Sequence, residues 1–162
     1  MKQNFKKYNS TLNVENQDSI HYAKVLGIAD KLFSVTEKAH GANFQMSCNG
    51  EDVWCASRSG NLEVNENFHG YQRLVERHTK DLMTLHHIVN INNKDKNVTV
   101  TLVGEFIGGM YNHKDVEKLN FGKVQKKSKI SYSNDVHFLP FEIRYNDIPQ
   151  HTHLLRAMCK LT

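Results

Sequence analysis

Apolar and polar residues alternate in five short stretches of the chain, and this spacing predicts β-strands. The stretches are residues 33–38, 42–48, 52–57, 97–107 and 136–145. In the fourth stretch, Val98, Val100 and Leu102 occupy every second position, which places them on one face of a strand. Asn49 and Gly50 lie between the second and third stretches and form a pair typical of hairpin turns. We therefore expect these two strands to be joined by a tight turn.

Two other stretches have the spacing of helices. Between residues 70 and 89, apolar residues such as Leu74, Leu82 and Leu85 recur at helical intervals. This is the longest predicted helix, and its apolar stripe fits packing against a core. Residues 18–31 predict a first helix, in which Ile20 and Ile28 lie at mixed helical spacing. Strands and helices in this arrangement predict an α+β fold.

The length and the charge of the chain limit what it can be. A chain of 162 residues has room for a single domain with one real core. The net charge of +4 is compatible with a polyanionic partner, but it is too small to require one. The clearest basic run, residues 123–129, is more typical of a solvated loop than of a direct RNA contact.

The sequence shows no membrane or targeting signal. Its apolar runs are too short to span a bilayer, and its start lacks the apolar segment of a signal peptide. Mitochondrial presequences are rich in arginine and poor in acids, whereas Glu15 and Asp18 precede the first arginine, Arg58. We therefore expect a cytoplasmic protein with no membrane partner. The three cysteines lack a close-paired spacing, so reduced thiols are expected, and the ten histidines form no zinc motif.

Lys38 has the most informative surroundings in the chain. It lies in the segment Glu-Lys-Ala-His-Gly-Ala-Asn, residues 37–43, where a predicted strand ends. A free lysine has a pKa of about 10.4, so roughly one amine in a few thousand is uncharged and nucleophilic at neutral pH. Burial or a nearby cation, such as a metal ion, lowers that pKa. Gly41 permits a bend or a close backbone approach that a side chain would block, and the amide of Asn43 suits a purine edge or a ribose. Taken alone, these residues also fit an exposed lysine followed by an ordinary turn.

Further blocks follow this segment in order along the chain. They are Ala-Ser-Arg-Ser-Gly at residues 56–60, Asn-Glu-Asn-Phe-His-Gly-Tyr at 65–71, Leu-Val-Gly-Glu-Phe-Ile-Gly-Gly-Met-Tyr at 102–111 and His-Phe-Leu-Pro-Phe-Glu-Ile at 137–143. Together with Phe-Lys-Lys-Tyr-Asn-Ser at residues 5–10, these blocks resemble the RNA ligase 2 family. That family includes a phage RNA ligase and the RNA-editing ligases of kinetoplastid mitochondria. The resemblance runs from one end of the chain to the other.

The resemblance implies a three-step reaction that uses ATP and Mg²⁺. Lys38 matches the lysine that attacks the α-phosphate of ATP, forming lysyl-AMP and releasing pyrophosphate. The AMP then passes to the 5′-phosphate end of an RNA, and a 3′-hydroxyl end displaces it to seal the strand. The implied partners are therefore RNA ends that carry a 5′-phosphate and a 3′-hydroxyl.

Four matching positions would hold the nucleotide through their side chains. Asn43 and Arg58 match residues that bind it, and the fork of donors on Arg58 suits oxyanions near the ribose and the strand end. Glu105 matches a glutamate that accepts from the ribose hydroxyls, because an ionised carboxylate only accepts hydrogen bonds. Phe141 matches the aromatic residue that stacks on adenine, although on its own it also fits a plain core position.

Four other matching positions surround these. Glu37 and Ala39 flank the nucleophile and would meet the adenine through their backbone, and His40 matches a histidine of the same motif. Glu142 stands where the family usually has aspartate, and its longer side chain would shift a metal ion or its water. It is the leading acidic candidate to hold Mg²⁺, which would neutralise the triphosphate and favour an uncharged Lys38.

The resemblance also predicts the fold and its limits. It implies a partial covalent-nucleotidyltransferase domain over residues 1–162, with mainly antiparallel sheets and flanking helices. After residues 141–143 the family continues to a motif IV glutamate and a motif V pair of basic residues, and neither follows here. We therefore expect a domain truncated at its carboxy-terminal end, which a second polypeptide could complete. The alternatives are an inactive remnant that binds nucleotide or RNA and, more distantly, a capping guanylyltransferase or a DNA ligase.

Overall fold

The chain forms two compact units. The computed structural model describes residues 5–9, 15–32, 37–95, 97–126 and 129–150. The smaller unit comprises Tyr8–Lys38, and the larger unit comprises Met1–Lys7 and Ala39–Thr162. No helix in the described part of the chain is both long enough and apolar enough to cross a membrane.

Among its described residues, the smaller unit contains one short helix, α1 (Gln17–Val25). The side-chain oxygen of Asn16 accepts from the backbone N–H of Asp18 and so caps its start. Gly27, with φ of 63°, closes its end: the N–H of Gly27 bonds to the carbonyl of Lys24, and the next N–H bonds to Ala23. The helix predicted at residues 18–31 therefore exists, but the prediction placed its end six residues too late.

The strand predicted at residues 33–38 falls mostly outside the described residues. Glu37 and Lys38 are its only described positions, and neither lies in a strand or a helix. Both are exposed.

The larger unit is built on an antiparallel sheet with the strand order β2-β1-β3-β4-β5. The strands are β1 (Ala42–Cys48), β2 (Val53–Ser57), β3 (Val100–Gly108), β4 (Val136–Tyr145) and β5 (Ile148–Pro149). The predicted strands at residues 42–48 and 136–145 are confirmed residue for residue, and β2 begins one residue later than predicted. The short β5 was not predicted. The mixture of this sheet with helices confirms the α+β class.

The start of β3 differs from the prediction for a reason that lies elsewhere in the chain. The stretch was expected to begin at residue 97, but β3 begins at Val100. The backbone N–H and carbonyl of Val98 both bind the side-chain amide of Asn90, and the N–H of Thr99 binds the side chain of Asn146. These side chains occupy the backbone groups that a longer strand ladder would have used.

The predicted hairpin turn is also present. β1 and β2 are connected through Asn49 and Gly50, and Gly50 has φ of 97°, a conformation that favours glycine. The side-chain oxygen of Asn49 accepts from the backbone N–H groups of Glu51 and Asp52. The turn is therefore stabilised by its own side chain as well as by strand pairing.

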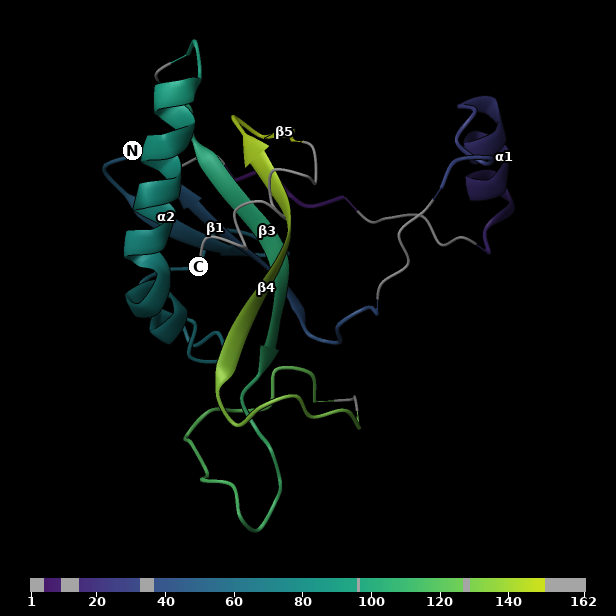
Figure 1. The fold of residues 1–162 in the computed structure, drawn as a ribbon. Helices are drawn as coiled ribbons and strands as arrows, with labels where there is room; N and C mark the ends of the chain where they lie inside the picture. Colours follow the sequence, from purple (N-terminus) through teal and green to yellow (C-terminus); the bar gives the residue numbers. More distant parts are fainter. Residues whose placement is uncertain (1–4, 10–14, 33–36, 96, 127–128, 151–162) are drawn as a thin grey trace. The chain divides into compact units, whose positions relative to one another are not determined.

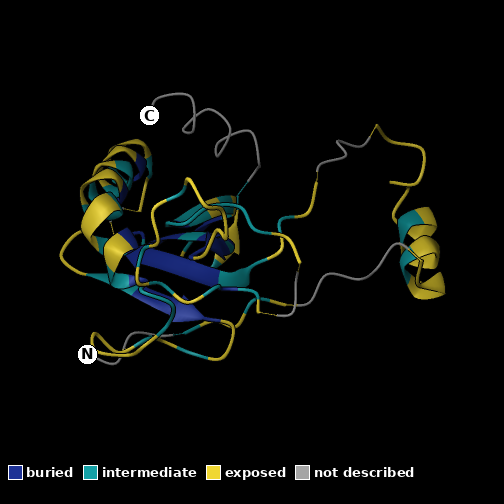
Figure 2. Cartoon of the chain, turned by 90° about the horizontal axis from the view of Figure 1, so that it is seen from below, coloured by how far each residue is buried: buried dark blue, intermediate teal, exposed yellow. Residues whose placement is uncertain are grey.

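One face of the sheet carries the core. The long helix α2 (Gln72–Asn92) lies along this face (Figure 1) and confirms the prediction for residues 70–89, ending three residues later. Phe44 is fully buried there, and its ring contacts the rings of Phe68, Tyr71, Phe106 and Phe138. Figure 2 shows buried residues along the strands and exposed ones on the outer side of α2.

Two cysteines of this core remain reduced, as expected. Cys48 and Cys55 are buried free thiols on neighbouring strands. Burial raises the pKa of Cys55 to about 12, which keeps the thiol protonated and unreactive at neutral pH. Cys159 lies outside the described residues.

Two ion pairs link α2 to the residue that precedes β4. Asp135 forms ion pairs with Arg73 and Arg77, at 2.9 and 2.7 Å. Burial by itself would raise the pKa of Asp135, but hydrogen bonds from Arg77, the Val136 amide and Arg73 lower it overall. The same residue accepts the backbone N–H of Gly109 through its carbonyl, so one position anchors both ends of the segment between β3 and β4.

Candidate functional site

The face of the sheet opposite the core carries several polar residues, together with the buried apolar residues Val103 and Ile107 of β3. Because side chains alternate along a strand, the β1 positions that alternate with Phe44 and Met46 point away from α2. On β1 and β3 these polar positions pair directly across the strands: Ser47 with Thr101, and Asn43 with Glu105. The hydroxyls of Ser47 and Thr101 bind each other at 2.9 Å in a buried position. Two residues predicted to bind nucleotide, Asn43 and Glu105, are therefore immediate neighbours on this face.

Arg58 lies beside this pair at the end of β2. Ser57, the last residue of β2, pairs with Phe44, so the next positions along the two strands are Arg58 and Asn43. Arg58 is exposed, and it stands at the start of a turn in which the Ser57 N–H binds the Gly60 carbonyl. The sheet thus brings three predicted residues to adjoining positions: Asn43 on β1, Glu105 on β3 and Arg58 just after β2.

The side chain of Asn43 has an acceptor with no partner. Its Oδ1 atom is buried, and no donor among the described residues reaches it. A buried acceptor left without a hydrogen bond costs about 1–3 kcal/mol. An N–H or O–H group of a bound ligand would remove this cost, so the observation favours a ligand with a donor at this point.

Glu105 holds the segment that follows Lys38. Its Oε1 atom accepts the backbone N–H of Gly41 at 2.9 Å. Gly41 has no space for a side chain, because an added Cβ would lie 2.1 Å from the carbonyl oxygen of Phe106 and 2.7 Å from Cγ2 of Ile107. The predicted role of Gly41 as a close backbone approach is confirmed. The binding of ribose by Glu105 stays a prediction, while its contact with the Gly41 backbone was not predicted.

Two side chains that sequence analysis did not single out bind the same segment. Nε2 of Gln125 donates to the carbonyl of Gly41 at 3.0 Å, and the hydroxyl of Tyr132 accepts the backbone N–H of His40 at 2.9 Å. Gln125 and Tyr132 are 84 and 92 residues away from their partners in the sequence. No local pattern in the chain could have indicated these contacts.

Phe141 occupies an irregular position in β4. Pro140 pairs with Gly104 and Glu142 pairs with Val103, so Phe141 is an extra residue between two consecutive pairs, a β-bulge. Its exposed fraction is 41%, whereas Phe138, three residues earlier, packs against the core. The alternative interpretation of Phe141 as a core residue is therefore excluded. Bulges redirect a side chain, and this one presents an aromatic ring to the surface.

Glu142, the residue proposed for the metal, is engaged by a neighbour. Nε of Arg144 donates to its Oε1, and Arg144 is only 6% exposed. Within the described part of the chain, no group of three or more histidine, cysteine, aspartate or glutamate side chains comes together as a metal site. Arg144 is a third residue, after Gln125 and Tyr132, that sequence analysis did not single out.

The positions nearest the nucleophile divide between the two units. Glu37 and Lys38 belong to the smaller unit, whereas Ala39 and His40 belong to the larger one. The sheet register relates the predicted residues of β1, β3 and β4 to one another. Lys38 lies outside this register and is joined to His40 through Ala39.

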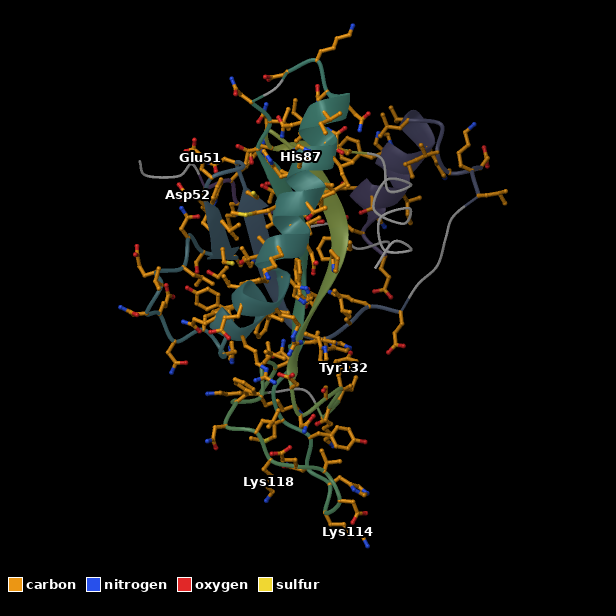
Figure 3. All side chains as sticks on the ribbon, turned by 60° about the vertical axis from the view of Figure 1, so that its left-hand side comes forward. Glu51, Asp52, His87, Lys114, Lys118 and Tyr132 are labelled. Atoms are coloured by element: carbon orange, nitrogen blue, oxygen red, sulfur yellow. The ribbon has the colours of Figure 1, made fainter. Side chains whose placement is uncertain are left out.

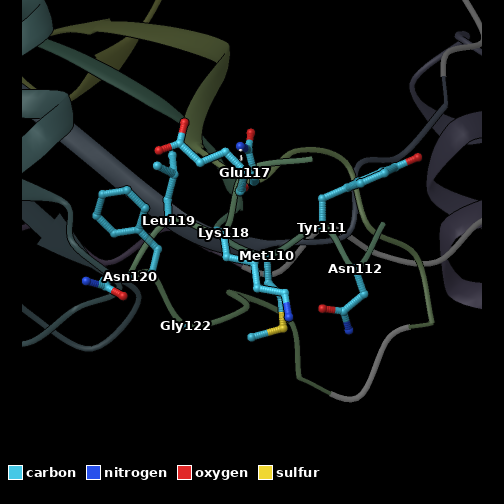
Figure 4. Close-up of a pocket in the computed structure, with 11 residues that line it drawn as sticks. Met110, Tyr111, Asn112, Glu117, Lys118, Leu119, Asn120 and Gly122 are labelled. Atoms are coloured by element: carbon cyan, nitrogen blue, oxygen red, sulfur yellow. Dashed lines mark hydrogen bonds between the residues drawn. The ribbon is translucent and has the colours of Figure 1, made fainter. Parts of the chain in front are cut away.

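A pocket lies apart from this face. It has a volume of about 470 Å³ and is formed by the segment that follows β3 (Figure 4). Its lining includes Tyr111, Glu117, Lys118 and Asn120, and none of the residues predicted for the site lines it. Four of the predicted residues, Asn43, Glu105, Phe141 and Glu142, lie on strands of the sheet, away from the lining of this pocket.

The sequence of this chain is similar to those of RNA ligases. Residues 31–160 match the family model described as RNA ligase. The chain is 32% identical over 156 residues to the mitochondrial RNA-editing ligase 2 of Trypanosoma brucei brucei (strain 927/4 GUTat10.1), covering 88% of this chain and 37% of that protein. It is 29% identical over 154 residues to the mitochondrial RNA-editing ligase 1 of Trypanosoma brucei brucei, covering 83% of this chain and 33% of that protein. The chain spans about a third of the length of these relatives.

Proposed function

This chain belongs to the RNA ligase family, and we propose that it takes part in ATP-dependent joining of RNA strands through AMP attached to Lys38. The observation that supports the proposal best is the pairing of Asn43 with Glu105 on the face of the sheet opposite the core. This pair presents one buried acceptor without a partner and one carboxylate, beside the exposed residue Arg58. Hydrogen-bond donors of a nucleotide match the first two groups, and its phosphates match the third.

In the proposed reaction AMP is transferred twice, first from ATP to Lys38 and then from Lys38 to the 5′-phosphate of the RNA. The uncharged Nζ of Lys38 attacks the α-phosphorus, an N–P bond forms, the bond to pyrophosphate breaks, and the amine proton leaves to solvent. An oxygen of the RNA 5′-phosphate then attacks the same phosphorus and releases the lysine amine. Finally the 3′-hydroxyl of the other end attacks the 5′-phosphate, loses its proton, and AMP departs.

Different residues of the chain would contact different parts of the nucleotide. Phe141, exposed at its bulge, would stack on the adenine, while the backbone of Glu37 and Ala39, with His40 beside them, would meet its edge. Asn43 and Glu105 would bind the sugar end, because a carboxylate repels phosphates. Arg58 would hold oxyanions near the ribose.

A magnesium ion would neutralise the triphosphate and favour the uncharged form of Lys38. Mg²⁺ commonly keeps several waters and uses one or two carboxylates together with substrate phosphates. Glu142 fits a water-mediated contact of this kind, because Arg144 already binds its carboxylate and the described residues offer no larger acidic cluster.

The proposed partners follow from the reaction. They are RNA ends with a 5′-phosphate and a 3′-hydroxyl, and a second polypeptide that supplies further cations to the α-phosphate. Preorganised cations are valuable there because charge develops on the α-phosphate during attack. A cytoplasmic location stays a prediction, while the names of the two relatives include the word mitochondrial.

Labelled ATP tests the proposal. The protein is incubated with magnesium and ATP labelled at either the α- or the γ-phosphate, then denatured and separated from free nucleotide. We expect the α label to remain with the protein and the γ label to be absent, because only AMP is transferred. Binding of ATP without retained α label would contradict group transfer and leave a nucleotide-binding role.

Truncation of Phe141 is expected to weaken ATP binding without unfolding the protein. Stacking of a base on an aromatic side chain contributes about 1–3 kcal/mol, so Phe141→Ala should raise the Kd for ATP by about tenfold or more. Because Phe141 is 41% exposed, the free energy of unfolding should change little. Isothermal titration calorimetry measures the Kd.

Two further variants make the Phe141 result specific. Phe141→Tyr keeps the ring and should retain ATP affinity. Ile148→Ala removes an apolar side chain that is 64% exposed on β5 and should leave the Kd unchanged. Equal ATP affinity of Phe141→Ala and the unmodified protein would remove Phe141 from the nucleotide site.

A further inference from the structure

The backbone of His40 and Gly41 is held from three directions by side chains of the larger unit. Glu105 accepts the N–H of Gly41, Gln125 donates to its carbonyl, and Tyr132 accepts the N–H of His40. The distances are 2.9, 3.0 and 2.9 Å, all within the range of good hydrogen bonds. The three contacts use both backbone groups of Gly41 and the N–H of His40, and we call them the clamp.

Two of these contacts come from one segment, the residues between β3 and β4. Gln125 lies before the return of this segment to the sheet, and Tyr132 lies shortly before β4 begins at Val136. Figure 3 shows Tyr132 near the end of the sheet, with Lys114 and Lys118 farther out in the same segment. The hydrogen bond from Gln125 is partly buried, so solvent competes less for it, whereas the bond to Tyr132 is exposed.

The close packing of Gly41 against Phe106 restricts where the Gly41 backbone can lie. Its α-carbon approaches Phe106 so closely that a methyl group would meet the Phe106 carbonyl oxygen at 2.1 Å. Phe106 is fully buried in the central strand of the sheet and cannot move aside. The three hydrogen bonds therefore act on a backbone that is already confined on one side.

We propose that Gln125 and Tyr132 are positioning residues for the nucleophile, which fix the backbone of His40 and Gly41 and thereby limit the positions that Lys38 can take. The inference rests on the proposed function, because positioning of Lys38 affects a reaction only if Lys38 attacks ATP. Lys38 precedes His40 by two residues, so few backbone torsions separate it from the clamped atoms. Holding a nucleophile in its attacking geometry removes an entropic part of the barrier.

This role predicts a particular kinetic pattern. Gln125 and Tyr132 bind the backbone beside Lys38 and are not among the residues that would contact ATP. Loss of their hydrogen bonds should therefore slow the attachment of AMP and leave the Kd for ATP within about twofold. A purely structural role would change the free energy of unfolding and leave the single-turnover rate of the folded protein unaltered.

The test uses variants that remove only the hydrogen-bonding group. Tyr132→Phe deletes the hydroxyl, and Gln125→Met keeps the length of the side chain without its amide. Each should lower the single-turnover rate of AMP attachment by about fivefold to tenfold, as expected for one lost hydrogen bond. The double variant should be slower by about thirtyfold or more. Tyr111→Phe and Gln150→Met, at positions away from the clamp, should keep the rate of the unmodified protein.

Amide hydrogen exchange separates failure of this inference from failure of the proposed function. The exchange rate of the His40 amide should rise in Tyr132→Phe, whether or not the protein transfers AMP. Unchanged exchange at His40 and an unchanged rate of attachment in Tyr132→Phe would overturn the positioning role. Faster exchange in a protein whose unmodified form never retains the α label would instead reject the proposed function and keep the clamp as a purely structural feature.

Discussion

Replacing Lys38 by arginine is expected to abolish the attachment of AMP, lowering the retained α label by at least about a thousandfold. Arginine keeps the positive charge and nearly the length of the side chain. Its guanidinium stays protonated in proteins, however, so it offers no lone pair for attack on phosphorus. The variant thus separates the nucleophilic role of Lys38 from any attraction between its charge and the phosphates.

The measurement combines label retention with ATP binding. Lys38→Arg should bind ATP with a Kd within about threefold of the unmodified protein, because the charge at this position is preserved. Lys31→Arg is a matched control, since Lys31 is another exposed lysine of the smaller unit and should retain the full label. Label that survives in Lys38→Arg would show that another residue is the nucleophile.

Replacing Gly41 by alanine is expected to damage both the fold and the reaction. The added methyl group would meet two backbone atoms of Phe106, at 2.1 and 2.9 Å, and Cγ2 of Ile107 at 2.7 Å. Backbone atoms of a central strand cannot shift without disturbing β1 and β4 on either side. We expect the free energy of unfolding to fall by about 2–4 kcal/mol, at or slightly above the usual cost of overpacking.

The same substitution should displace the clamped backbone. The hydrogen bonds to Glu105 and Gln125 require Gly41 to approach the sheet, and alanine prevents that approach. The rate of AMP attachment should therefore fall by more than about tenfold, even at temperatures where the variant is folded. Urea unfolding gives the stability, and single-turnover labelling gives the rate.

Gly122→Ala supplies the control for Gly41→Ala. An added Cβ at Gly122 meets no atom within 4 Å, and the residue is exposed. Its free energy of unfolding should change by less than about 0.5 kcal/mol. If Gly41→Ala were as stable and as active as Gly122→Ala, the close approach of Gly41 to Phe106 would contribute to neither the fold nor the reaction.

Local patterns predicted the elements well wherever pairing and burial agreed with them. β1 and β4 match the alternating stretches residue for residue, and Gly50 sits in the expected turn. Errors arose where a single residue or a distant contact decided the boundary. Gly27 ended α1 although apolar residues continued beyond it, and Asn90 took the backbone groups that would have lengthened β3.

The candidate site was predicted in its residue types and only partly in its geometry. Asn43, Arg58 and Glu105 were identified by their order along the chain, and the sheet places them at adjoining positions. The exposure of Phe141 could not be predicted, because it depends on a bulge that appears only when β4 pairs with β3. The buried partner of Glu142, Arg144, looks from sequence like an ordinary strand residue.

The sequence by itself determined the local features of this protein: the alternation of its strands, the spacing between Lys38 and Asn43, and the glycine between them. These depend on residues that are covalent neighbours, so their order in the chain carries the information. Tertiary structure alone decided that Glu105, Gln125 and Tyr132 converge on His40 and Gly41 from 64, 84 and 92 residues away. Alternation predicts that a strand exists but not which strand it pairs with or in what register. The pairing of β1 with β3 brought Glu105 to Gly41, and the path of the segment between β3 and β4 brought Gln125 and Tyr132 to the same backbone.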